Sequence, residues 1–311
     1  MKDKYINHNN TSIHYKTTGK GLPVVLIHGF AEDSTIWNNQ VEFLKNDYNL
    51  ILPDLPGSGK SGLIEAPLSL VVEDPDNFGG EGLGLRAVGQ TPLSFGEGLG
   101  VRSIVIEDYA ACIKQILVEE KIDRCIMIGH SMGGYITLAF AEKYPESLMS
   151  LGLFHSSAYA DDTAKKETRK KAITFIEANG AEAFLKTSIP GLFYNQGNSK
   201  LADALIQSVV RPLKVARQLS QLDQALIQYY NAMITRPDRT KILSGAIIPV
   251  LFIMGEHDKA VPFKNSLEQS YLPDHSYVYI LRNSAHIGML EEPDRSNQIL
   301  AYFLLAQQHN N

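Results

Sequence analysis

Gly129-His130-Ser131-Met132-Gly133-Gly134 is the stretch that decides the fold of this chain. It matches the pattern G-x-S-x-G and stands between an apolar run, 124–129, and a helical pattern, 132–144, that stops at Pro145. A serine on such a strand-to-helix turn takes strained backbone angles, and its hydroxyl projects above the sheet. The start of the helix adds unpaired N–H groups and a positive dipole end. The motif predicts that Ser131 is a catalytic nucleophile, with a purely structural turn as the alternative.

Strand and helix patterns alternate on both sides of this motif. Short apolar runs are typical of strands that are buried on both faces of a parallel sheet. Such runs occupy residues 22–27, 48–55, 124–129, 148–155, 249–254 and 277–281. Helical periods cover 104–120 and 132–144, and residues 3–18 read as a hairpin around the turn at Asn9-Asn10. The alternation predicts an α/β fold with a parallel sheet and right-handed crossovers.

Two regions interrupt this alternation and divide the chain. Residues 157–246 are helical and more polar, which predicts a helical cap inserted into a core formed by 1–156 and 247–311. Within the cap, the charged run Lys165–Lys171 is interpreted as a solvated helix face. Residues 63–103 are rich in Gly, Leu and Glu and contain two near copies of one short segment, too few for a solenoid. We expect a flexible surface insertion there, with a functional lid as the alternative.

Composition and charge exclude several classes of protein. The 311 residues carry 29 Lys and Arg against 34 Asp and Glu, and a net charge of -5 argues against a nucleic-acid partner. No run approaches the roughly 18 to 20 apolar residues of a membrane span, and the first residues lack the apolar centre of a secretory signal. Two cysteines, Cys112 and Cys125, form neither a disulfide framework nor a zinc motif. We therefore expect a cytoplasmic protein without a membrane or nucleic-acid partner.

A serine nucleophile needs a general base, and the base needs an acid that orients it. In the arrangement that G-x-S-x-G marks, the acid and then the histidine follow the serine along the chain. The apolar run 249–254 leads into Asp258, and the run 277–281 leads into His286. We predict Asp258 as the acid and His286 as the base, with Glu256 as the rival acid. His28 and His130 flank motifs, where we expect a packing or hydrogen-bonding role, and the remaining alternative bases are His155, His257 and His275.

The negative oxygen that forms during acyl transfer needs preorganised donors. We expect one from the backbone N–H of Met132, directly after the nucleophile, and the other from the N–H of Phe30 in the loop after the first buried strand. A plain tight turn is the alternative for that loop. Trp37, Tyr159 and Phe193 are predicted to line the substrate pocket, although ordinary packing is the competing interpretation for each.

One further segment resembles a nucleotide site and is excluded. Gly57-Ser58-Gly59-Lys60-Ser61 looks like the end of a P-loop, but Asp54 stands where the first glycine of G-x-x-x-x-G-K-[ST] belongs, and no helical pattern follows. No nucleotide or other cofactor is expected from the residues.

Together these motifs resemble the α/β-hydrolase superfamily, and in particular its capped, single-domain branch of enol-lactonases, carboxylesterases, perhydrolases and C–C bond hydrolases. The resemblance covers about 1–62 and 104–306 and rests on these segments: His28-Gly29-Phe30, Asp54–Ser61, Gly129–Gly134, Gly255–Asp258 with Pro262, and His286 with Glu292-Pro293. It implies an eight-stranded, mostly parallel sheet, an active site at the carboxyl ends of the strands under the cap, and neither a metal nor an organic cofactor.

The nucleophile type narrows the chemistry. Relatives that attack with an aspartate cleave halides or epoxides, whereas Ser131 indicates acyl transfer through an acyl-serine. We therefore expect hydrolysis of a small ester or lactone; the preference for esters over amides is an analogy with the family. Three alternatives stay open: C–C bond cleavage or perhydrolysis at the same triad, a hydrolase-fold ligand receptor without turnover, and a chain whose insertion prevents proper folding.

Overall fold

The computed structural model describes residues 1–65, 103–195, 199–215 and 219–308. Almost all of the predicted insertion, 66–102, lies outside the described residues. The described chain forms an eight-stranded sheet in the order β1-β2-β4-β3-β5-β6-β7-β8. The strands are β1 (Lys2–His8), β2 (Thr11–Thr18), β3 (Leu22–Ile27), β4 (Tyr48–Pro53), β5 (Cys125–His130), β6 (Leu148–Phe154), β7 (Val250–Gly255) and β8 (Ser276–Leu281). The predicted fold class is confirmed, and so are the predicted apolar strands. β8 differs in burial: it lies at the edge of the sheet, and its Val278 and Ile280 side chains are exposed instead of buried on both faces.

The first two strands form the predicted hairpin. β1 pairs antiparallel with β2, and the turn residues Asn9 and Asn10 both take positive φ, 49° and 61°. Two successive positive φ values match the right-handed twist of the flanking strands, and asparagine tolerates them better than most residues. From β4 to β8 all neighbouring strands are parallel, so their carboxyl ends meet at one edge of the sheet.

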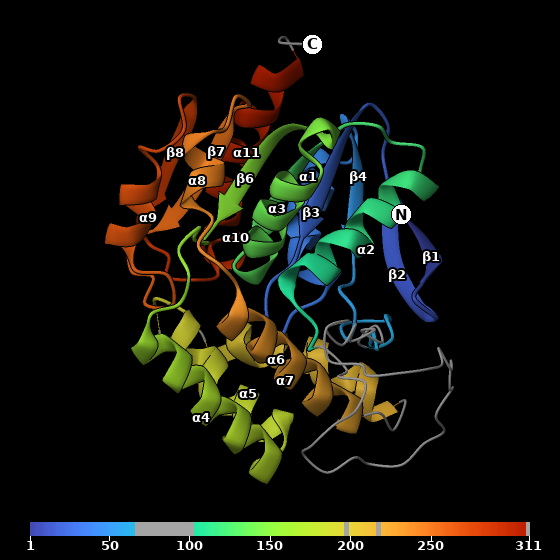
Figure 1. The fold of residues 1–311 in the computed structure, drawn as a ribbon, viewed down its shortest axis with the longest axis vertical. Helices are drawn as coiled ribbons and strands as arrows, with labels where there is room; N and C mark the ends of the chain where they lie inside the picture. The colour runs from blue at the N-terminus through green and yellow to red at the C-terminus, as the bar shows by residue number, and fades with distance from the viewer. Residues whose placement is uncertain (66–102, 196–198, 216–218, 309–311) are drawn as a thin grey trace, which may run out of the picture.

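Helices cover the sheet in two pairs. α2 (Ile106–Glu119) packs against α3 (Met132–Lys143), and Figure 1 shows both crossing the near face of the sheet. α1 (Asn38–Leu44) packs against α11 (Pro293–Gln308). Because α3 is buried nearly all round, it lacks the polar stripe of a surface helix and lies in the centre of the core. The remaining short helices of the core are α8 (Thr240–Ser244), α9 (Phe263–Gln269) and α10 (Gly288–Glu291).

Four longer helices form a separate group across one end of the sheet (Figure 1). They are α4 (Thr163–Asn179), α5 (Ala181–Ser188), α6 (Ser199–Val215) and α7 (Leu219–Thr235). Aromatic side chains join this group to the core: the ring of Phe30 lies 4.4 Å from that of Tyr230, and the Tyr229 hydroxyl donates to the Pro56 carbonyl at 2.7 Å. The helical group therefore covers the edge at which the parallel strands end. No helix within the described ranges is long and apolar enough to cross a membrane.

Candidate active site

Ser131 stands at the turn between β5 and α3 in a strained conformation, with φ 50° and ψ -114°. A non-glycine residue with positive φ is uncommon and marks a position that the surrounding structure holds in place. The Ser131 amide donates to the Phe154 carbonyl at 3.0 Å, and the Ser156 hydroxyl donates to the Ser131 carbonyl at 2.6 Å. At Gly133 a Cβ atom would lie 2.5 Å from the Ile27 carbonyl oxygen. Only glycine lets α3 start this close to β3, which fixes where the serine hydroxyl points.

The structure brings the predicted nucleophile, base and acid together, although they come from three different strand ends. His286 Nε2 lies 2.9 Å from Ser131 Oγ, and His286 Nδ1 lies 2.8 Å from Asp258 Oδ2. The other carboxylate oxygen of Asp258 accepts from the amides of Ala260 at 2.8 Å and Val261 at 2.9 Å. The carboxylate is thus fixed by its own loop, and it fixes the ring that faces the serine. This is the geometry in which a serine hydroxyl transfers its proton to an imidazole.

The environment keeps Asp258 charged. Burial raises the pKa of this carboxyl, but the nearby His286 outweighs that effect and holds the pKa well below its usual range. Burial also lowers the pKa of His155 to about 4, and its Nδ1 accepts the Gly255 amide at 3.0 Å. His155 is therefore neutral at pH 7, which leaves His286 as the proton-carrying partner of Asp258. The rival acid Glu256 is exposed and lines a different cavity, beside Tyr194.

Phe30 and Met132, the predicted oxyanion donors, flank the serine from two loops. Phe30 lines the same cavity as Ser131, and Met132 is the first residue of α3. Outside the regular helices and strands, neither amide donates a hydrogen bond to any other described part of the chain. Ala31 takes a positive φ of 56°, so the backbone turns sharply directly after Phe30. Two amides without an internal acceptor, beside the nucleophile, suit a developing negative oxygen.

A buried pair, Glu32 and His130, joins the Phe30 loop to His286, and no local sequence pattern indicated it. Glu32 Oε2 accepts from the Gly29 amide at 2.7 Å and lies 3.0 Å from His130 Nδ1. His130 Nε2 lies 2.9 Å from the carbonyl of His286. Both His130 nitrogens thus face acceptors, and a histidine that donates from both carries a positive charge. Burial lowers the pKa of His130 and raises that of Glu32, but their mutual attraction reverses both effects.

Above the triad lies a cavity of about 540 Å³ between the core and the cap. Its wall includes Ser131 and His286, apolar side chains such as Leu192 and Met233, and the phenol of Tyr135. Tyr135 follows the nucleophile by four residues on α3. That spacing places it on the same helix face, and it is the signal by which sequence reasoning could have found it.

Several predictions about this wall need correction. Trp37 is fully buried in the core, where its ring packs 5.6 Å from that of Phe154, and it does not line the cavity. Tyr159 and Phe193 do not line it either; Phe193 borders a separate cavity beside His257. These three residues therefore drop out of the substrate surface.

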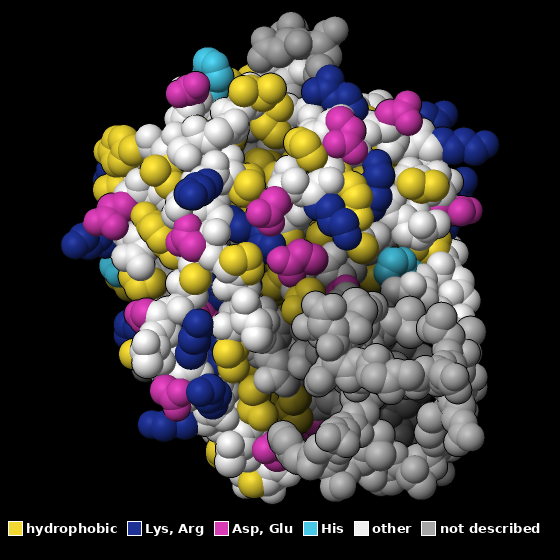
Figure 2. Space-filling model, in the orientation of Figure 1, with side chains coloured by type: hydrophobic (Ala, Val, Ile, Leu, Met, Phe, Trp, Pro, Cys, Tyr) yellow, Lys and Arg dark blue, Asp and Glu magenta, His cyan; other side chains and the backbone are white. Residues whose placement is uncertain are grey.

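The prediction for the charged run Lys165–Lys171 is correct for only some of its residues. Lys165 and Arg169 line the cavity, whereas Lys170 is 59% exposed and pairs with Glu167. Figure 2 shows the outward-facing Lys and Arg side chains over α4, at the lower left of the molecule. The interpretation of the whole run as a solvated face is therefore wrong for Lys165 and Arg169. These two residues lie one helical turn apart, on the side of α4 that faces the cavity.

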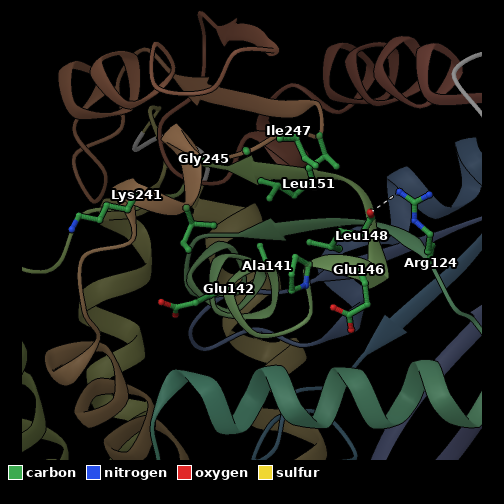
Figure 3. Close-up of a pocket in the computed structure, with 13 residues that line it drawn as sticks. Arg124, Ala141, Glu142, Glu146, Leu148, Leu151, Lys241, Gly245 and Ile247 are labelled. Atoms are coloured by element: carbon green, nitrogen blue, oxygen red, sulfur yellow. Dashed lines mark hydrogen bonds between the residues drawn. The ribbon is translucent and has the colours of Figure 1, made fainter.

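A second cavity, of about 580 Å³, lies away from the triad (Figure 3). Residues at the end of α3 and around β6 and α8 form its wall, among them Ala141, Leu148, Leu151 and Ile247. No Ser, Cys or His stands among the described residues of its wall, whose charged side chains are Arg124, Glu142, Glu146 and Lys241. Over the ranges that the structure describes, no three His, Cys, Asp or Glu side chains converge as metal ligands would.

Known proteins resemble this chain over nearly its whole length. A 2-hydroxy-6-oxo-6-phenylhexa-2,4-dienoate hydrolase of Comamonas testosteroni is 24% identical over 298 residues, which span 94% of this chain and 91% of that protein. A solved esterase of Thermogutta terrifontis superposes with a TM-score of 0.77 at 23% identity and covers 99% of both chains. An enol-lactonase of Burkholderia xenovorans superposes with a TM-score of 0.76 at 18% identity, covering 97% of this chain and all of that one. At such identities the solved structures support the fold alone.

The family itself is established by a match to the model of the alpha/beta hydrolase fold over residues 23–293. That range starts in β3, ends at the first residue of α11, and encloses the serine turn, both strand-end loops and the cap. This chain belongs to the α/β-hydrolase-fold family.

Proposed function

We propose that this protein is a serine hydrolase that cleaves small carboxylic esters or lactones through an acyl-serine intermediate. The contact between Ser131 Oγ and His286 Nε2, 2.9 Å long between two side chains that line one cavity, carries this proposal. The esterase and the enol-lactonase among the structural neighbours are consistent with it. The proposal includes a reducing, cytoplasmic location, which suits the two buried free thiols of Cys112 and Cys125.

In the first step His286 takes the proton of Ser131 while the serine oxygen attacks the substrate carbonyl. The amides of Phe30 and Met132 stabilise the negative oxygen of the tetrahedral intermediate. His286 then passes its proton to the leaving alcohol oxygen, and the C–O bond breaks. In the second step a water gives a proton to His286 and attacks the acyl-serine; His286 returns that proton to the Ser131 oxygen as the acyl C–O bond breaks and the acid leaves. Asp258 stabilises the charged imidazole in both steps.

C–C bond cleavage at the same triad is the second candidate. The identity to the Comamonas hydrolase, whose substrate name describes a dienoate, is the observation that favours it. The two chemistries differ in the leaving group, which is an oxygen in an ester and a carbon in the second case. The residues around the triad do not separate them.

Hydrolysis of p-nitrophenyl esters from acetyl to octanoyl tests the proposal. The wild type is expected to turn them over, Ser131→Ala is not, and Ser208→Ala, a serine on the distant α6, is the matched control. A fluorophosphonate followed by mass spectrometry reports the nucleophile independently of substrate choice. Labelling of Ser131 without ester turnover would favour C–C bond cleavage over ester hydrolysis. A folded wild type that is neither labelled nor active contradicts a serine hydrolase.

A further inference from the structure

Positive charge gathers on one wall of the cavity above Ser131. Lys165 and Arg169 lie one turn apart on α4 and both line the cavity. The Lys165 ammonium donates to the Ala260 carbonyl at 2.8 Å, which leaves further N–H donors of that group without a carboxylate partner. Exposed Lys259 stands at the rim of the same cavity.

The acidic groups nearby do not balance this charge. Two buried carboxylates lie in the region. Glu32 lines the cavity and pairs with His130 at 3.0 Å, and Asp161 pairs with two cations, Arg169 at 2.5 Å and Arg236 at 2.9 Å. Asp162 also borders the cavity, but it is exposed and caps α4 by accepting the Lys165 amide at 2.7 Å. The inner wall therefore keeps a positive excess.

The pKa of Tyr135, which lines the cavity, reflects this excess of positive charge. Its ring lies under the Arg236 guanidinium at 3.9 Å, and its hydroxyl has no hydrogen-bond partner within the described chain. Burial raises the pKa of the Tyr135 phenol, but Arg236, Lys165 and Arg169 together lower it below its ordinary value. Tyr230 lines the same cavity, yet burial raises its pKa to about 12. The cations therefore favour negative charge at the position of Tyr135 more than at that of Tyr230.

We propose that Lys165, Arg169 and Tyr135 form a subsite for a carboxylate, so that the substrate is an ester or lactone that carries a carboxylate at the end away from the reacting carbonyl. The inference rests on the proposed function for the role of Ser131. The subsite supplies charge-assisted hydrogen bonds from an ammonium, a guanidinium and a phenol. Tyr135 follows Ser131 by one turn of α3, about 6 Å along the axis, so the carboxylate and the reacting carbonyl are separated by a short chain.

Matched ester pairs test the subsite. Mono-p-nitrophenyl glutarate and adipate are compared with p-nitrophenyl pentanoate and hexanoate, after subtraction of the spontaneous rate. The ratio of kcat/KM, charged over neutral, is expected to exceed one in the wild type. It is expected to fall about tenfold in Lys165→Met, the size of one hydrogen bond to a charged group. Lys171→Met removes the same charge from the exposed face of α4 and is expected to keep the wild-type ratio.

Tyr135→Phe is a second variant, which removes one hydroxyl and keeps the ring; it is also expected to lower the ratio. A ratio that Lys165→Met and Tyr135→Phe leave unchanged, or an equal loss on both esters, overturns the subsite. If the wild type hydrolyses no ester, binding still decides the question. Adipate, against sodium chloride of equal ionic strength, is expected to raise the Tm of the wild type and of Lys171→Met but not of Lys165→Met. An equal shift in all three proteins, or none, contradicts a carboxylate site.

Discussion

Asp258→Asn isolates what the buried carboxylate does for the catalytic histidine. The substitution keeps the shape of the side chain and leaves an oxygen that accepts the amides of Ala260 and Val261. The group that faces His286 Nδ1 then becomes an NH₂ donor in place of an acceptor. His286 must turn its lone pair toward that donor and carry its proton on Nε2, where it cannot accept the proton of Ser131.

The size of the loss follows from the contact. Asp258 and His286 are 2.8 Å apart at their nearest atoms, and their side chains are only 2% and 6% exposed. Two unit charges about 4 Å apart attract with about 4 kcal/mol at an effective dielectric constant of about 20. This attraction exists only while the imidazole is charged, so its loss falls on the transition state. We expect kcat to fall by about 10³-fold from this effect and toward about 10⁴-fold with the wrong tautomer.

The assay is the hydrolysis of the best p-nitrophenyl ester at pH 7 and 25 °C, with KM and kcat measured separately. Glu256→Gln is the matched control, because it removes one charge two residues away from an exposed side chain. We expect that control to stay within about twofold of the wild type. A thermal melt of each variant shows whether the fold is retained.

Three results would refute this reasoning. A folded Asp258→Asn variant with wild-type kcat means that His286 does not depend on this carboxylate. A large loss in Glu256→Gln, with Asp258→Asn active, assigns the acid to the other side chain. A raised KM with an unchanged kcat would place Asp258 in substrate binding and not in proton transfer.

Three further outcomes follow from the same contacts. Glu32→Gln removes the negative charge that His130 faces at 3.0 Å, and we expect a lower Tm and a kcat reduced by about tenfold, measured on the same ester. Burial raises the pKa of Asp54, but its hydrogen bond to His14 lowers the pKa by more, so the pKa lies well below its ordinary value. The free energy of unfolding, measured by urea titration, should therefore fall as the pH drops below about 4. In Asp54→Asn it should fall less steeply. Gly133→Ala places a Cβ 2.5 Å from the Ile27 carbonyl oxygen, so we expect loss of soluble, phosphonate-labelled protein, whereas Gly191→Ala, which meets no atom within 4 Å, should behave as wild type.

The sequence was informative wherever the signal is local. The central strands are continuous apolar runs, and the side chains proposed for catalysis stand in the loops just after strand ends: Ser131 directly after β5, Asp258 after β7 and His286 after β8. In a parallel sheet the carboxyl ends of the strands meet at one edge, so strand ends that are 155 residues apart in sequence are neighbours in space. The order of Ser131, Asp258 and His286 along the chain, together with a parallel sheet, was therefore enough to predict that these three side chains lie close together.

Proximity in sequence misled where the chain turns away from the site. Trp37 follows the Phe30 loop by seven residues, and a pocket role looked reasonable. The short 3-10 helix Ser34–Trp37 instead directs the indole into the core, against Phe154 and His130. Glu32, for which no sequence pattern indicated a role, borders the cavity instead. The direction of a loop side chain depends on tertiary packing, which no local pattern contains.

The cap shows the same limit in one helix. Lys165, Arg169 and Lys170 have similar chemistry and stand within six residues, yet the first two border the cavity and the third faces water. What separates them is the rotation of α4 about its axis. That rotation is fixed at Asp161, directly before the helix, where one carboxylate holds Arg169 of α4 and Arg236 beyond α7. Because Arg236 is 67 positions further along than Arg169, the sequence of the helix alone could not reveal which of its cations would face the substrate.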